Sequence, residues 1–150
     1  MDLPLAIGEG INTTKLIAER YGFEERQSNY YLEAAEILGL LARRGTKFAL
    51  SDQGKKYLLM DISERKLVLV RKMIMVPIIN RVLAEILARY DKLVSKKDLE
   101  NLTLQSSPTS GSTVTRRAQT IISWFRWLGE QTEVFQVDFE TIQLGTGKGR

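Results

Sequence analysis

Two helices are indicated near the start of the chain by their apolar spacing and flanking residues. The first spans residues 14–21, because Thr13 can cap its start and Gly22 can adopt the left-handed conformation that ends a helix. The second spans residues 26–38, and Gly39 closes it. Its inward positions recur at spacings of four and three residues: Tyr31, Ala35 and Leu38.

A small hairpin and a further helix are expected next. Leu40 and Leu41 lead into the polar turn Arg43-Arg44-Gly45-Thr46-Lys47, and residues 48–50 form the return arm. Ser51 can then cap a helix that continues through Tyr57 to Met60.

Two longer helices are expected in the middle of the chain. Ser63 is the expected cap of the first, which turns Leu67 and Val70 inward and ends before Pro77. Proline suits the first turn of a helix, so Pro77 is expected to open the second. This helix carries a broad apolar stripe and should be buried along one side: Ile79, Val82, Leu83, Ile86, Leu87 and Tyr90.

The last third of the chain repeats this order. Ser95 and Asp98 have the spacing of a capping box for a short helix that ends near Leu102. After a loop over residues 105–112, a long helix begins at Ser112 or Thr113, with Gly129 after its last inward residue. Its inward positions are Val114, Ala118, Ile121, Phe125 and Leu128. Residues 134–142 suit a strand or hairpin, and residues 145–150 a frayed basic tail.

The same order of elements therefore occurs twice without a letter-by-letter repeat. Helix, turn, longer helix and β-hairpin is the arrangement of a winged helix, in which the second helix of the motif can enter the major groove of DNA. We expect a mainly α protein with small β-hairpin wings (α+β), built from two winged-helix units in tandem. The expected domains are residues 1–76 and residues 77–150, the second including the basic tail.

Composition narrows the range of activities. The 150 residues are 43% hydrophobic and 27% charged, as in an ordinary globular chain, and the net charge of +4 favours an anionic partner. The chain has no histidine and no cysteine, which removes the usual general base, the thiol nucleophile and the commonest zinc ligands. No secretory signal or bilayer-spanning segment is indicated, so a cytoplasmic protein without membrane association is expected.

Four stretches, in two parts of the chain, carry a resemblance to a known family. Residues 25–35 (ERQSNYYLEAA), 38–40 (LGL) and 50–54 (LSDQG) resemble winged-helix domains found with bacterial restriction-modification enzymes, with Arg-Gln-x-x-Tyr-Tyr as the distinctive part. Residues 112–128 (STVTRRAQTIISWFRWL) are similar to a second winged helix that follows the first in such proteins. The resemblance implies a DNA-recognising module, either a standalone regulator or a partner of a nuclease or methyltransferase.

Carried over residue by residue, the resemblance implies DNA contacts in both units. They are Arg26, Gln27, Asn29 and Tyr30 in the first unit and Arg116, Arg117, Gln119 and Thr120 in the second. The chemistry agrees, because guanidinium grips phosphate or guanine, and asparagine or glutamine can read adenine. Ser123 is expected on the same polar face as Gln119 and Thr120.

The expected wing supplies three more cations. Arg43, Arg44 and Lys47 surround Gly45 and could reach the DNA backbone or minor groove. Basic hairpin tips also serve solubility alone, and Tyr30 could equally pack against a neighbouring helix.

No catalytic, metal or cofactor site is expected. The segment Glu64-Arg65-Lys66 has no strand-borne aspartate before it, so it reads as a surface charge cluster rather than a nuclease site. Residues 145–149 contain glycines and a lysine but lack the spacing of a phosphate-binding loop.

The leading hypothesis is non-catalytic, sequence-selective binding of double-stranded DNA, in transcription regulation or in target recognition for a restriction-modification system. The alternative is a winged-helix scaffold for protein partners, since fold alone does not fix function. A homodimer would set the spacing of two DNA half-sites, but the sequence identifies no dimer surface.

Overall fold

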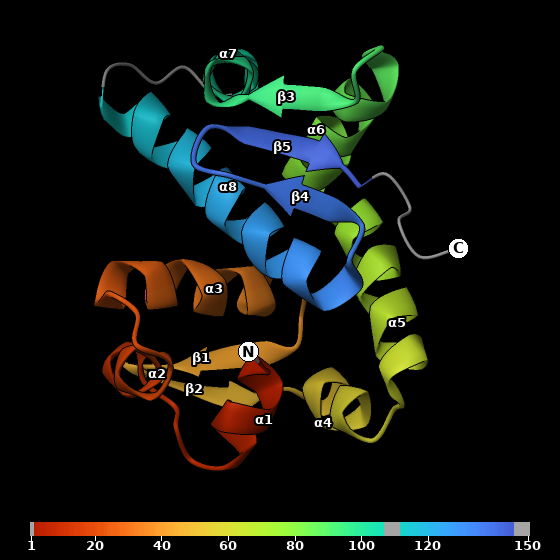
Figure 1. Ribbon diagram of the computed structural model, residues 1–150. Coiled ribbons are helices and arrows are strands. Elements are labelled where there is room, and N and C mark those ends of the chain that lie inside the picture. The colour runs from red at the N-terminus through yellow and green to blue at the C-terminus, as the bar shows by residue number, and fades with distance from the viewer. Residues whose placement is uncertain (1, 107–111, 146–150) are drawn as a thin grey trace. The chain divides into compact units, whose positions relative to one another are not determined.

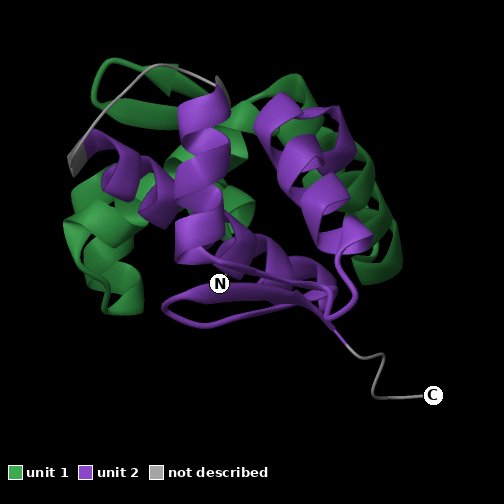
Figure 2. Cartoon of the chain, turned by 90° about the horizontal axis from the view of Figure 1, so that it is seen from above, with its two compact units in different colours: residues 1–72 green, residues 73–150 purple. Residues whose placement is uncertain are grey.

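The computed structural model describes residues 2–106 and 112–145 and is mainly helical with small antiparallel β-structures (Figure 1). The chain forms two compact units, residues 1–72 and 73–150, which Figure 2 colours separately. The division falls inside the last turn of one helix, Ile62–Met75.

The first unit contains a three-helix segment followed by a hairpin and two more helices. Its elements are α1 (Leu3–Gly8), α2 (Thr14–Tyr21), α3 (Glu25–Ile37), β1 (Leu41–Arg44), β2 (Lys47–Leu50), α4 (Asp52–Leu58) and α5 (Ile62–Met75). The second unit has six elements: α6 (Pro77–Ala88), β3 (Leu93–Ser95), α7 (Lys96–Ser106), α8 (Ser112–Thr132), β4 (Phe135–Val137) and β5 (Thr141–Leu144).

Local capping chemistry explains where α2 and α4 begin. The Thr13 hydroxyl accepts a hydrogen bond from the Leu16 N–H, and the Ser51 hydroxyl accepts one from the Gly54 N–H, so both expected caps are confirmed. Gly22 ends α2 with a φ of +70°, as expected for a glycine in the left-handed conformation.

The core of the first unit is formed by the inward faces of its helices and by the hairpin. Tyr31, Ala35 and Leu38 are buried, as their spacing predicted, and the Phe23 ring packs edge-on against Tyr31 with centroids 5.5 Å apart. In the hairpin, Leu41 pairs with Leu50 and Arg44 with Lys47. The Phe48 N–H also donates to the Asn12 carbonyl at 2.8 Å, which ties the segment between α1 and α2 to β2.

Helix α5 begins one residue before the expected cap. Asp61, not Ser63, caps it: the Glu64 N–H donates to the Asp61 carboxylate at 2.8 Å, and the Asp61 N–H donates to the Glu64 carboxylate at 3.0 Å. The expected inward position of Leu67 was also wrong, since this side chain is 54% exposed, and Val70 is only half-buried, while Leu69 and Met73 are buried.

The second unit packs three helices, α6, α7 and α8, against a three-stranded antiparallel sheet of order β3-β5-β4. The register pairs Val94 with Ile142 and Phe135 with Leu144. The expected hairpin of residues 134–142 is present as β4 and β5, whereas β3 was not expected. The inward positions predicted for α8 are all buried, and Phe125 packs edge-on against Phe135 at 5.1 Å.

Three helix details differ from the expectations for this unit. In α6, Ile79, Val82 and Ile86 are buried and Leu83 is half-buried, but Leu87 is exposed, so the buried stripe is narrower. Tyr90 is also exposed and lies beyond the end of the helix at Ala88. Helix α7 continues one turn past Leu102, to Ser106. Helix α8 passes through Gly129, where a side chain would meet the Phe135 carbonyl oxygen at 2.9 Å, so this glycine permits close packing of β4 rather than ending the helix.

Candidate nucleic-acid interface

Helix α3 presents Arg26, Asn29 and Tyr30 on the side away from its buried face, whereas Gln27 lies at the edge of that face. Arg26 is exposed, and Gln27, Asn29 and Tyr30 are partly exposed. Their side chains are already engaged within the helix. The Arg26 Nε donates to the Tyr30 hydroxyl at 2.6 Å, and the Asn29 amide donates to the Glu33 carboxylate at 2.8 Å.

Gln27 has a structural partner. Its amide donates to the hydroxyl of the buried Tyr31 at 2.8 Å, which satisfies a polar group that burial would otherwise leave unpaired. Helix α3 also carries three glutamates and one arginine, so its net negative charge repels phosphate. A ligand would have to displace internal hydrogen bonds to reach most of this face.

The β1–β2 hairpin carries the most concentrated positive charge of the first unit. Gly45, with a φ of +65°, makes the turn, and no acidic residue lies between Glu36 and Asp52. Arg43 is held by an ion pair with Glu36 at 3.3 Å and stacks on the Phe48 ring. The side chains of Arg44 and Lys47 are exposed and make no hydrogen bond or ion pair with any described residue.

Helix α8 of the second unit presents the second group near its N-terminal end. Arg116 and Arg117 are exposed, while Val114 and Ala118 on the opposite face are buried. Neither guanidinium is engaged by another side chain within residues 2–106 and 112–145. The two arginines therefore offer charge and donors that the fold itself does not use.

The remaining α8 candidates differ in how far their side chains are exposed to solvent. Gln119 and Thr120 are partly exposed, and the Thr120 hydroxyl donates to the Arg116 carbonyl at 2.9 Å. Ser123 is buried at 3% exposure, and its hydroxyl donates to the Gln119 carbonyl at 3.0 Å. The placement of Ser123 on the exposed polar face was therefore wrong, because a serine whose hydroxyl bonds back to the helix can be buried without an unpaired group.

Lys96 and Lys97 are basic residues of the second unit that the sequence analysis did not single out. They open α7, and the Lys96 N–H donates to the Glu140 carbonyl at 2.6 Å, which brings this end of α7 next to the β4–β5 turn. Their position directly after a capping serine is the signal that could have identified them.

The β4–β5 turn itself is acidic. Asp138 accepts hydrogen bonds from the backbone N–H groups of Glu140 and Thr141, both at 2.8 Å, and these bonds hold the pKa of its carboxyl below the usual range. Arg126 of α8 donates to the Asp138 carbonyl and lies over the Phe139 ring. Phe139 projects from the turn at 82% exposure.

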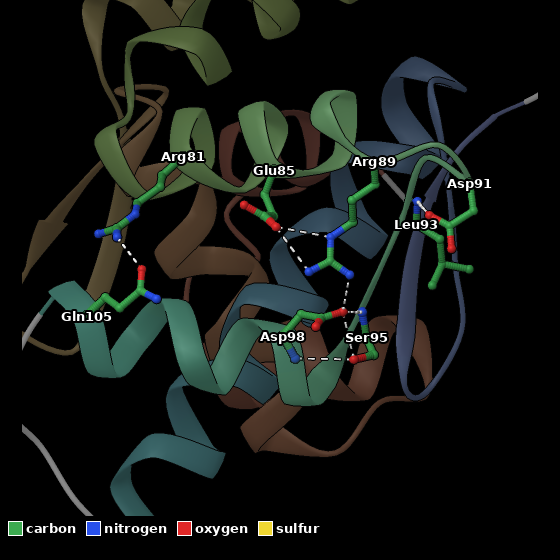
Figure 3. A network of polar contacts seen from close by, with 8 residues as sticks. All are labelled: Arg81, Glu85, Arg89, Asp91, Leu93, Ser95, Asp98 and Gln105. Atoms are coloured by element: carbon green, nitrogen blue, oxygen red, sulfur yellow. Dashed lines mark hydrogen bonds and ion pairs between the residues drawn. The ribbon is translucent and has the colours of Figure 1, made fainter.

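A polar network fixes the start of α7 against α6 (Figure 3). Arg89 donates to Glu85 at 3.1 Å and to Asp98 at 2.9 Å, and Asp98 accepts from the Ser95 N–H and hydroxyl. Burial alone would raise the pKa of Asp98, but the bonds from Ser95 and Arg89 outweigh it and hold the pKa below its ordinary value. The expected capping box is confirmed, with Arg89 added to it.

Neither a metal centre nor a membrane span is present in the described part of the chain. No group of three or more carboxylates there could hold a metal ion. None of its helices is both long enough and apolar enough to cross a bilayer.

Comparison with known proteins gives one result. No curated protein and no solved structure matches the sequence significantly. Residues 2–133 match a family model described as a domain of unknown function, DUF7226. That match covers α1 to α8, and so includes every residue of both candidate groups. The chain therefore belongs to the DUF7226 family.

Proposed function

We propose that the chain is a non-catalytic protein that binds double-stranded DNA through two winged-helix units, with α8 as the principal contact helix. The element order supports this proposal. In the second unit, α6 is followed by β3, the helix pair α7 and α8, and the β4–β5 hairpin, with β3 against β5. A helix pair followed by a hairpin is the order of a winged helix.

The first unit supports the same reading. Helices α1, α2 and α3 precede the β1–β2 hairpin. Between α1 and α2, the Asn12 carbonyl accepts a hydrogen bond from the Phe48 N–H of β2. This segment corresponds in the element order to β3 of the second unit, which pairs with β5. Both units therefore have a helix, a short segment bonded to the last strand, two more helices and a hairpin.

The observation that carries the proposal is the exposed, unengaged pair Arg116 and Arg117 near the start of α8. The N-terminal part of the second helix of such a motif is the part that contacts base edges. Arginine can bind guanine or phosphate there with two parallel hydrogen bonds. Gln119 and Thr120, one turn further along, are the candidates for base contact, and Arg44 and Lys47 of the first hairpin are the candidates for backbone contact.

The physiological role follows from the resemblance to winged-helix domains of restriction-modification systems. A regulator would bind its own operator, whereas a target-recognition component would deliver a nuclease or methyltransferase to its site. Both roles need selectivity among DNA sequences, which can be tested by selecting bound duplexes from a random pool.

The test of DNA contact compares two double variants that lose the same charge. Arg116→Ala/Arg117→Ala should raise the dissociation constant for a labelled duplex at least about tenfold, since a hydrogen bond to a charged group contributes roughly 1.5–3 kcal/mol. The matched control is Lys55→Ala/Lys56→Ala on α4, which removes two exposed lysines outside both candidate groups. Equal losses in the two variants would show only a response to net charge and would contradict a specific role for α8.

One observation favours the alternative of a protein-binding scaffold. Phe139 is exposed between Asp138 and Glu140, and an apolar side chain flanked by acids suits a basic-rimmed pocket of a protein better than a phosphate backbone. If this alternative holds, the chain fails to bind duplex DNA even at low salt, and Phe139→Ser abolishes capture of the protein partner.

A further inference from the structure

Helix α5 has a partly exposed apolar stripe next to its buried face. Leu69 and Met73 are buried, whereas Leu67 is 54% exposed, Ile74 is 49% exposed and Val70 is partly exposed. These three exposed positions are spaced by three and four residues, the spacing of a helix–helix seam. Ser63, four residues before Leu67, continues the stripe with a small side chain.

Opposite charges flank this stripe along one edge. Glu64 and Arg71 are seven residues apart, so they lie two turns apart on the same edge, and both are exposed. The Arg71 side chain makes no hydrogen bond or ion pair with a described residue. Lys66 lies on the other edge of the stripe.

We propose that α5 pairs in antiparallel orientation with α5 of a second copy of this chain, forming a symmetric homodimer. In this register, Leu67 packs against Val70 of the partner subunit, and Ser63 packs against Ile74 of the partner subunit. The two-fold axis repeats each contact.

The charges beside the stripe favour a second copy of this chain as the partner, and they favour the antiparallel orientation. The register that pairs the apolar residues of the two helices also places Glu64 beside Arg71 of the partner subunit. The two-fold symmetry forms this ion pair twice. A parallel pair would instead bring Lys66 beside Arg71 of the partner subunit, a repulsion between like charges. The antiparallel pair also brings the exposed Ile62 at the start of one α5 to the end of the other, where Met75 is exposed.

The dimer is expected to be weak and dependent on concentration. The seam is only two heptads long, so the interface lies at the small end of the range for specific association. A dissociation constant in the micromolar range, about 1–100 μM, corresponds to such an interface. This inference rests on α5 alone and does not require DNA binding.

A charge exchange tests the pairing by sedimentation equilibrium of the full chain without DNA. Glu64→Arg and Arg71→Glu should each weaken dimerisation at least about tenfold, because each turns both ion pairs into like-charge pairs. The double variant Glu64→Arg/Arg71→Glu restores opposite charges across the axis and should return the dissociation constant to within about threefold of the wild type.

Two controls keep this test interpretable. Glu64 also accepts the Asp61 N–H, so Glu64→Arg removes one capping hydrogen bond, but the double variant lacks the same bond and its recovery must come from the pairing. Lys55→Glu on α4 reverses one exposed charge outside α5 and should leave the dissociation constant unchanged. A wild type that stays monomeric throughout the range, or a double variant that stays as weak as the single ones, would overturn the proposal.

Discussion

Gly54 is the residue whose replacement should be least tolerated among the glycines of the helices. It lies inside α4, and a Cβ atom there would come within 2.1 Å of the Leu40 carbonyl oxygen, which also accepts the Ser51 N–H. Gly8, in α1, would meet only the ends of the Leu50 and Leu58 side chains, at 3.3 and 3.7 Å. Side chains can move aside, whereas a hydrogen-bonded backbone carbonyl cannot do so cheaply.

Gly54→Ala should therefore destabilise the first unit by about 3 kcal/mol or more, although alanine is ordinarily favoured over glycine in a helix by about 1 kcal/mol. Urea unfolding followed by far-UV circular dichroism measures this change. The control Gly8→Ala should stay within about 1 kcal/mol of the wild type. A stabilising effect of Gly54→Ala would contradict the close approach of Leu40 to α4.

At the scale of elements, the network at the start of α7 predicts a pH dependence. The pKa of Asp98 is lowered in the folded state, so its contribution to stability is present at neutral pH. That contribution is lost as the pH falls below the ordinary carboxyl value of about 3.9 and through the lower folded value. Protonated Asp98 resembles asparagine in charge, so Asp98→Asn removes the dependence.

The free energy of unfolding should therefore differ by about 1–2 kcal/mol between the wild type and Asp98→Asn at pH 7, with the difference shrinking toward zero between about pH 5 and pH 2. Both tryptophans of the chain, Trp124 and Trp127, lie in α8, so their fluorescence in a urea titration reports on the second unit. A difference that is constant with pH would show that Asp98 does not act through its charge.

Local chemistry explains which elements the sequence predicted. Thr13, Ser51 and Ser95 each bond to a backbone group within three residues, so their roles are visible from neighbouring residues alone. Strand β3 could not be predicted in this way, because its three residues are ordered by pairing with β5 more than forty residues later. Such a short segment has no periodicity of its own.

The sequence could predict the candidate residues by their type, but not which of them already form hydrogen bonds within the fold. The spacing in α3 placed Arg26, Asn29 and Tyr30 on one face, but it could not indicate that Arg26 bonds to Tyr30 and Asn29 to Glu33. The burial of Ser123 depends in the same way on its bond to the Gln119 carbonyl. Residues 107–111 and 146–150, which include most of the loop and the basic tail named above, lie outside the described residues.

At the scale of the whole molecule, the two units differ in where their cations lie. In the first unit the hairpin is basic and α3 is acidic, whereas in the second unit the start of α8 is basic and the β4–β5 turn is acidic. We therefore expect α8 to supply the main helix contact and the β1–β2 hairpin to supply backbone contacts. This division of roles could not be drawn from the net charge of +4 alone.

The most direct measurement of the central claim is the salt dependence of duplex binding, by fluorescence anisotropy with wild type and Arg116→Ala/Arg117→Ala. Each neutralised phosphate contributes about −0.9 to the slope of log K against log salt concentration. The account predicts a steep linear fall for the wild type and a slope shallower by about 2 for the double variant. Absence of wild-type binding at the lowest salt, or an unchanged slope in the double variant, would contradict it.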